Sequence, residues 1–241
     1  MFNLLKSDLK ALFKWKATIY AILAISALGV SSILVNISYD DPTLSSFFEF
    51  TYINMMITSV IIGLFIYRDY SQNTIRNKIV VGHGRASIFF AKTITILTMF
   101  ITTAIAQTAA VLIVGSLFGD LDYIDWAIFA QNYVVYFITI VVVTAMVSLI
   151  SINIQSPIGA MLPMMLLFFI MFVGMIILEM LMINEDTAMI ELFRTVPVLN
   201  SLTLVETEKP FDLAATCVIG VGMFLLMEVL GLIVFKKIDL K

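Results

Sequence analysis

The sequence predicts an all-α integral membrane protein with six transmembrane helices. Of its 241 residues, 61% are hydrophobic and only 13% are charged, whereas soluble domains usually carry about 25% charged residues. A soluble fold of this length could not bury so much apolar surface. The composition therefore excludes a soluble enzyme, a nucleic-acid-binding protein and a disordered chain, and the expected environment is a lipid bilayer.

The stretches with few or no charges are long enough to cross a bilayer, which takes about 20 apolar residues of helix. Acidic clusters and one basic loop separate most of them, and a polar turn that ends in proline, at 153–157, favours a hairpin between two further spans. We expect a single transmembrane domain over residues 1–241. The predicted spans are 17–38, 50–67, 88–118, 127–152, 158–183 and 212–235.

The basic residues predict the orientation of these spans. If the N-terminus is cytoplasmic, 12 of the 14 Lys and Arg residues lie inside and only Arg194 and Lys209 lie outside. Cytoplasmic loops carry such an excess of Lys and Arg. Because an even number of spans returns the chain to its starting side, we expect a multi-pass plasma-membrane protein with both termini cytoplasmic.

A basic amphipathic helix is predicted ahead of the first span, within residues 1–16. Its apolar residues recur at helical spacing, while Asp8 and the lysines take the other face. The apolar residues are Phe2, Leu5, Leu9, Leu12 and Phe13. A helix of this kind lies in the membrane interface with its lysines near anionic headgroups. It serves either as an anchor or as a contact for a cytoplasmic partner.

The longest cytoplasmic loop, residues 68–85, contains a second short helix. Ser71 can cap a helix that runs from Thr74 to Val81, and Gly82 can end it. The apolar side of this helix consists of Ile75, Ile79 and Val80. An amphipathic helix carried on a loop suits docking to another protein.

The outer segment at 184–211, between the fifth and sixth spans, is too apolar for a free loop. Pro197 interrupts any helix within it. Non-helical backbone at membrane depth requires shielding by protein or water. We therefore expect a short re-entrant helix packed against the bundle.

Residues with catalytic chemistry are scarce. The only histidine, His83, lies in the cytoplasmic loop, and the only cysteine, Cys217, lies in an apolar run, so no intrachain disulfide forms. Neither a metalloprotease motif, a serine-hydrolase motif nor a phosphate-binding loop occurs in the sequence. We expect no catalytic residue, no metal site and no cofactor bound by this chain, so ATP would have to be handled by another chain.

Two acidic residues, Glu179 and Glu228, lie within predicted spans. Glu179 is five residues before Asn184, close to the outer interface, whereas Glu228 is eight residues before Lys236, about 12 Å along a helix. An ionisable side chain inside a membrane is a functional hypothesis. Both glutamates are candidate functional carboxylates, and a hydrogen-bonded structural role is the alternative.

The order of these parts resembles the type 2 permease family of ATP-binding-cassette transporters. The closest likeness lies in the stretch from Asp69 to Ile79, followed by Gly82, Arg85 and Lys92. This stretch is similar to the acidic-x-x-x-Gly-Thr-Ile/Leu-Arg-x-x-hydrophobic pattern that family members carry in the same loop. Asn73 stands where the family has glycine, and asparagine also tolerates a left-handed backbone.

The resemblance implies that the loop helix is a coupling helix, which sits in a groove of a separate nucleotide-binding ATPase subunit. The residues implied in docking are Thr74, Ile75, Arg76, Lys78, Ile79, Gly82 and Arg85. It also implies a second permease chain, identical or related, and ATP with Mg on the ATPase. Family members mostly export their substrates, and the analogy with small bacterial exporters suggests a peptide, a lipid-like molecule or an antibiotic.

The alternative is a secondary transporter or channel that works without ATP. Such proteins carry charged or broken helices near mid-membrane, in matching positions of two halves. Residues 1–125 and 126–241 show no repeat of this kind. A membrane scaffold or sensor built on the permease fold is a third possibility.

Overall fold

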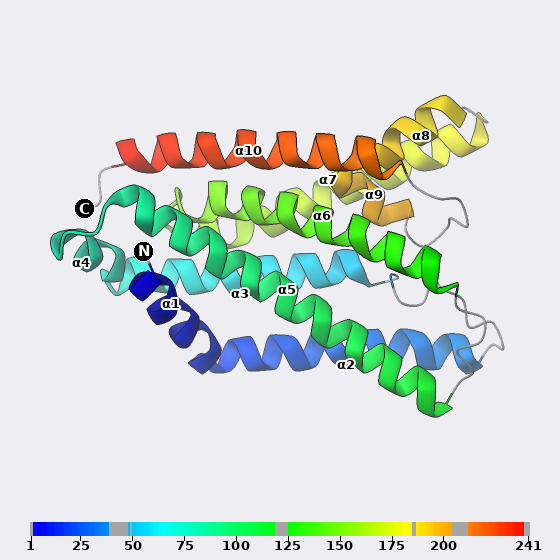
Figure 1. The fold of residues 1–241 in the computed structure, drawn as a ribbon, viewed down its shortest axis with the longest axis horizontal. Coiled ribbons are helices and arrows are strands. Elements are labelled where there is room, and N and C mark those ends of the chain that lie inside the picture. The colour runs from blue at the N-terminus through cyan, green and yellow to red at the C-terminus, as the bar shows by residue number, and fades with distance from the viewer. Residues whose placement is uncertain are drawn as a thin grey trace.

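The computed structural model describes residues 2–38, 48, 50–118, 125–184, 187–203 and 212–238, and all regular structure in these residues is α-helical (Figure 1). Six helices are long and apolar enough to cross a membrane, in agreement with the predicted number of spans. They are α2 (Lys16–Ser38), α3 (Thr51–Ser71), α5 (Arg85–Phe118), α6 (Trp126–Ser151), α7 (Pro157–Ile183) and α10 (Leu213–Lys237). These helices indicate a multi-pass membrane protein.

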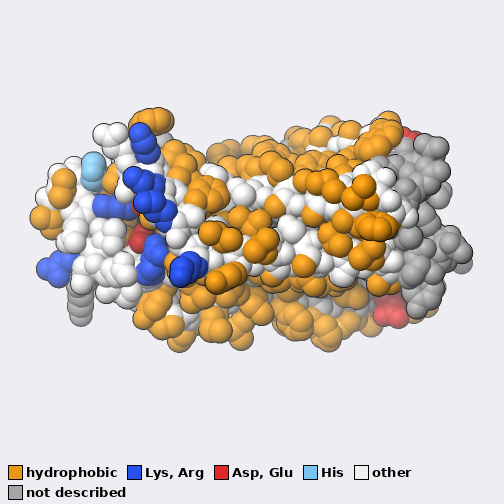
Figure 2. All heavy atoms as spheres, turned by 90° about the horizontal axis from the view of Figure 1, so that it is seen from below, with side chains coloured by type: hydrophobic (Ala, Val, Ile, Leu, Met, Phe, Trp, Pro, Cys, Tyr) orange, Lys and Arg blue, Asp and Glu red, His pale blue; other side chains and the backbone are white. Residues whose placement is uncertain are grey.

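The shorter helices lie at the two ends of the bundle. They are α1 (Phe2–Lys14), α4 (Thr74–Val80), α8 (Thr187–Thr195) and α9 (Pro197–Thr203). Figure 1 shows α1, α4 and the C-terminal end of α10 at one end, and α8 and α9 at the other. Lys and Arg side chains gather at the end that carries α1 and α4 (Figure 2). We call this the basic end, formed by α1, α4, the start of α5 and the end of α10.

The spans begin and end where the local chemistry allows. The Asp125 carboxylate caps α6 by accepting hydrogen bonds from the backbone N–H groups of Ala127 at 2.9 Å and Ile128 at 3.3 Å. Pro157 opens α7 after the predicted turn, in a position where its missing N–H costs nothing. In contrast, α3 continues to Ser71, past the predicted end at 67, because its last turn carries polar residues that find partners at the basic end.

The spans pack as pairs, chiefly α2 on α5, α10 on α6 and α3 on α7. The α3–α7 contact brings the two backbones close together, because a Cβ added at Gly63 would lie 2.5 Å from the backbone oxygen of Ala160. Hydrogen bonds join α3, α5 and α6 as well. The Asn54 amide nitrogen donates to the Gln107 side-chain oxygen at 2.8 Å and to the Tyr136 hydroxyl at 3.2 Å. Polar side chains that bond across helices in this way stabilise membrane bundles.

The segment after α7, which was predicted to be on the outer side, forms two short helices where one was predicted. The break between them falls at Pro197, which opens α9 and whose backbone oxygen accepts a 2.6 Å hydrogen bond from the Thr139 hydroxyl of α6. Phe193 of α8 and Val198 of α9 are buried, so both helices pack on the described part of the bundle. Residues 185–186 and 204–211 of the predicted segment lie outside the described residues.

The N-terminal helix buries a different face from the predicted one. Leu4, Asp8 and Leu12 are buried, while Phe2 and Phe13 are exposed. The assignment of Asp8 to the solvated face with the lysines was therefore wrong. The reason is ion pairing, since Asp8 faces basic side chains from two other helices, as described below.

Candidate functional site at the basic end

Helix α4 stands between α3 and α5, and two residues with positive φ set its limits. Asn73 precedes it in the left-handed region with φ 55°, and Gly82 follows it with φ 97°. The N–H groups of Gly82 and His83 donate to the carbonyls of Ile79 and Lys78, a C-terminal cap of the kind that glycine favours. The predicted capping role of Ser71 was wrong, because its hydroxyl donates to the Arg68 carbonyl at 2.9 Å and it belongs to the last turn of α3.

The apolar residues of α4 do not share one environment. Ile75 is only 1% exposed and belongs to the core of the chain itself, and Ile79 is half-buried against that core. In contrast, Val80 is 78% exposed and Val81, immediately after the helix, is 77% exposed. An assignment of Ile75 to a docking surface does not fit this packing, whereas the two valines form an uncovered apolar pair.

The polar residues implied in docking also lie in different environments. Arg76 is exposed and Thr74 is half-buried. Arg85, at the start of α5, donates from one guanidinium nitrogen to the backbone oxygens of Lys236 at 2.8 Å and Ile238 at 2.7 Å. Since the last carbonyls of a helix lack partners within the helix, Arg85 fixes the end of α10 against the α4–α5 turn.

A buried cluster of four charges, which we call the ion cluster, connects α4 to three other helices. It consists of Asp8 of α1, Asp69 of α3, Lys78 of α4 and Lys92 of α5. The Lys78 ammonium lies 2.6 Å from one Asp8 oxygen, and the Lys92 ammonium lies 3.2 Å from the other. Lys92 also pairs with Asp69. Two carboxylates and two ammonium groups balance one another, as buried charges require.

The burial of the ion cluster has electrostatic consequences. Lys92 is fully buried, and the side chain of Lys78 is 12% exposed. Burial lowers the pKa of the Lys78 ammonium, the neighbouring Lys92 lowers it further, and the bond to Asp8 opposes both effects. Removing one member would therefore leave the ion cluster with one uncompensated buried charge.

Aromatic rings cover the basic side chains next to the ion cluster. The Lys92 nitrogen lies 5.0 Å from the centre of the Phe65 ring. The guanidinium carbon of Arg68 lies 4.7 Å from that ring and 5.1 Å from the Trp15 ring. These cation–π contacts join the junction of α1 and α2, and the start of α5, to the end of α3, so the basic end is a packed assembly.

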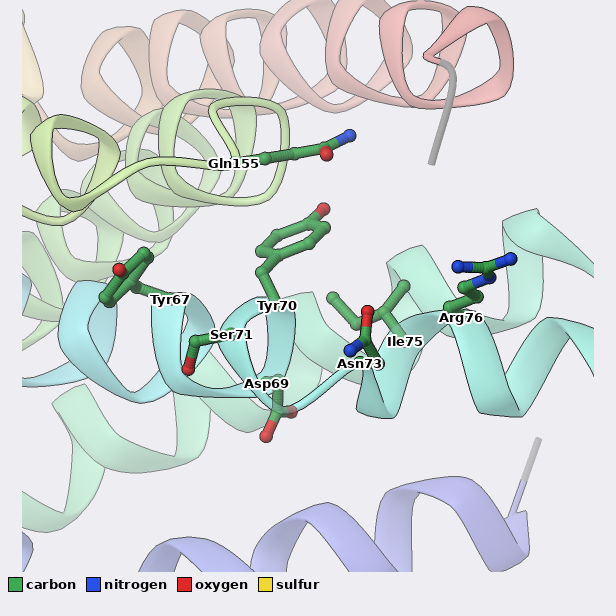
Figure 3. A pocket seen from close by; sticks show the side chains of 8 residues that line it. All are labelled: Tyr67, Asp69, Tyr70, Ser71, Asn73, Ile75, Arg76 and Gln155. Carbon is green, nitrogen blue, oxygen red and sulfur yellow. The ribbon is translucent and has the colours of Figure 1, made fainter. Parts of the chain in front are cut away.

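A pocket of about 220 Å³ opens beside the start of α4 (Figure 3). Its lining consists of Tyr67, Asp69, Tyr70, Ser71, Asn73, Ile75, Arg76 and Gln155. Tyr70 points towards the α6–α7 turn, where its hydroxyl donates to the Ile152 carbonyl. Asp69 points the other way, towards α1 (Figure 3). The pocket lining therefore includes one member of the ion cluster, Asp69, and the residue that bonds α3 to the α6–α7 turn, Tyr70.

The two intramembrane glutamates differ in their surroundings. Glu179 is exposed on α7. Glu228 of α10 is only 5% exposed, and its carboxyl oxygens lie within hydrogen-bond distance of the hydroxyls of Ser148 on α6 and Thr93 on α5. Among the described residues, no group of three or more His, Cys, Asp or Glu side chains could hold a metal ion. Of the two glutamates, only Glu228 is therefore buried among the spanning helices.

The sequence pattern did not identify the ion cluster, although it contained one signal of it. Lys92 is the only charge in the apolar stretch 86–119, and such a residue needs a buried partner. Neither periodicity nor spacing pointed to Asp8 as that partner. No protein-family model matches the chain, and no curated protein matches it.

Proposed function

We propose that this chain is the membrane-spanning permease subunit of an ATP-binding-cassette exporter, with the basic end cytoplasmic and driven by a separate ATPase subunit. The observation that carries the proposal is the uncovered pair Val80 and Val81, presented at the end of a short helix between two spans. The stretch from Asp69 to Ile79 resembles the coupling region of type 2 permeases. An exposed apolar pair beside charged residues suits a protein interface.

The ion cluster supports a mechanical role for α4 in this proposal. A force applied to Val80 and Val81 reaches α1, α3 and α5 through Lys78, Asp8, Lys92 and Asp69, since each pair is a direct contact. Arg85 extends the connection to the end of α10. Closure of the ATPase would in this way move several spans together.

A second permease chain would complete the translocation pathway. In the most apolar stretches of α7 and α10, only 22% of the residues are buried within the chain. Their exposed faces are therefore available to lipid or to another copy. We expect a peptide, a lipid-like molecule or an antibiotic as the exported substrate.

The test is purification of the full chain in mild detergent from its native cells, with mass spectrometry and ATPase assays of the complex. We expect a chain with a phosphate-binding loop to copurify and to hydrolyse ATP. Val80→Ser with Val81→Ser should reduce its retention at least tenfold, because burying a valine side chain is worth about 1.5 to 3 kcal/mol and 1.4 kcal/mol is a factor of ten.

The matched control is Leu117→Ser with Phe118→Ser, an adjacent exposed apolar pair at the far end of α5. It should retain the ATPase in full. A valine double variant that is well folded and still holds a full complement of ATPase would refute the docking role.

The ATP-independent transporter remains the second candidate, and the buried carboxyl of Glu228 favours it, because such residues carry protons or ions in secondary transporters. Purification of a stable, folded chain with no ATPase, which then moves protons across vesicle membranes by itself, would favour this candidate.

A further inference from the structure

The hydrogen bonds around Glu228 form a compact polar site within the spanning helices. The Ser148 oxygen lies 2.6 Å from Glu228 Oε1 and 2.9 Å from the carbonyl oxygen of Ala145. The Thr93 hydroxyl lies 3.2 Å from Glu228 Oε2 and 3.5 Å from Oε1. The Glu228 carboxyl therefore joins α10 to α5 through Thr93 and to α6 through Ser148.

The number of protons in these contacts depends on the state of Glu228. If the carboxyl is ionised, Ser148 and Thr93 supply two protons for the three shortest contacts, and the Ser148 proton cannot serve both Glu228 and Ala145. If Oε1 is protonated, it donates to Ser148, Ser148 donates to Ala145, and Thr93 donates to Oε2. Only the neutral carboxyl places one proton in each of these three contacts.

The charged groups on the neighbouring helices give Glu228 no counter-charge. Helices α6 and α9 contain no charged residue. On α5, Lys92 is held by Asp8 and Asp69, and Arg85 by the end of α10. The other charged residues on α10 and on the helices that contact it are Glu191 and Arg194 of α8 and Lys236 and Lys237 of α10. Among the described residues, none of these charged groups forms an ion pair with Glu228.

Apolar packing separates Glu228 from the basic end. Phe89 of α5 and Phe235 of α10 are both fully buried, with ring centres 6.0 Å apart. Gly231, one turn from Glu228, lets Phe89 approach so closely that an added Cβ would lie 2.8 Å from the ring. A carboxylate in this place would lack both water and a cation, and a neutral carboxyl needs neither.

We propose that Glu228 is a proton-binding site, which holds one proton while α10 packs on α5 and α6 and releases it when this packing opens. On opening, the O–H bond breaks, the proton passes to water and Glu228 keeps the negative charge. The ligand of the site is the proton alone. The proposal does not depend on a partner ATPase, so the two can fail separately.

Infrared spectroscopy of the full chain in phosphatidylcholine vesicles tests the proposal at neutral pH. We expect a carbonyl band of a protonated carboxyl, which shifts in D₂O and is lost in Glu228→Gln. Glu179→Gln, the matched control on the exposed glutamate, should keep it. In Thr93→Val, which removes the donor to Oε2, the band should move to higher frequency. A missing band, a band that survives in Glu228→Gln, or an unmoved band in Thr93→Val would overturn the site.

The rate at which the carbonyl band shifts after transfer into D₂O measures exchange of the Glu228 proton and so tests the release step. Gly231→Ala forces Phe89 away and should speed the shift about tenfold, which corresponds to 1.4 kcal/mol in the opening equilibrium. Gly222→Ala is the control on the same helix, because an added Cβ there meets no atom within 4 Å. Equal rates in both variants would show that the packing around Phe89 does not retain the proton.

Discussion

At the scale of single residues, pairing decides where Asp8 lies. Its helix carries exposed lysines on one side, and helical periodicity alone assigns Asp8 to them. Two ammonium groups from α4 and α5 instead draw it into the bundle. The Asp8 carboxylate is the partner of the Lys78 ammonium, so burial of this charge on α4 depends on α1.

A double-mutant cycle on Asp8 and Lys78 measures this dependence. Asp8→Asn should destabilise the protein by about 3 to 5 kcal/mol, because it leaves the Lys78 ammonium without its carboxylate partner. Lys78→Gln should cost less, because Asp8 keeps Lys92 as a partner. The double variant should lose less than the sum, with a coupling of about 0.5 to 3 kcal/mol. Thermal unfolding in detergent gives these values. Lys10→Gln, at an exposed lysine of α1, is the control and should change stability by about 0.5 kcal/mol at most. Additive losses would contradict the pairing.

At the scale of elements, the long helices were predictable and their contacts were not. Runs of apolar residues defined the spans because the membrane sets a minimum length. The left-handed Asn73 and the ending glycine Gly82 were also consistent with the sequence pattern. The sequence pattern could not predict that Ile75 is buried and Val80 exposed. An amphipathic pattern does not tell whether the apolar side of a helix contacts the chain itself or a partner.

The close approach of α3 and α7 gives a prediction at this scale. Gly63→Ala places a Cβ within 2.5 Å of the Ala160 oxygen and 2.7 Å of its Cα. Backbone atoms cannot turn aside as a flexible side chain can, so the helices must separate, at a cost of about 1 to 3 kcal/mol. Gly222→Ala makes the same chemical change in open space and should be neutral or stabilising, since alanine favours helix. Unfolding temperatures of the two variants decide the matter, and equal stability would show that α3 and α7 adapt freely.

At the scale of the whole molecule, the charge distribution relates the fold to the membrane. Both the start of α1 and the end of α10 lie at the basic end, with α4 between them (Figure 1). The even number of spans accounts for this placement. The sequence alone could predict that both ends lie together, because span counting needs no tertiary contacts. It could not predict the ion cluster, whose four members come together only after α1, α3, α4 and α5 have packed.

The orientation of the bundle is the last prediction. We expect the basic end to face the cytoplasm, because Lys and Arg are retained on that side during insertion. The test places single cysteines at the exposed residues Arg76 and Thr187, in a background where Cys217 is serine. An impermeant maleimide should label Thr187→Cys in intact cells, and Arg76→Cys only after the cells are permeabilised. Labelling of Arg76→Cys in intact cells would show that the bundle has the opposite orientation. Val80 and Val81 would then lie on the side without ATP, where no ATPase could dock.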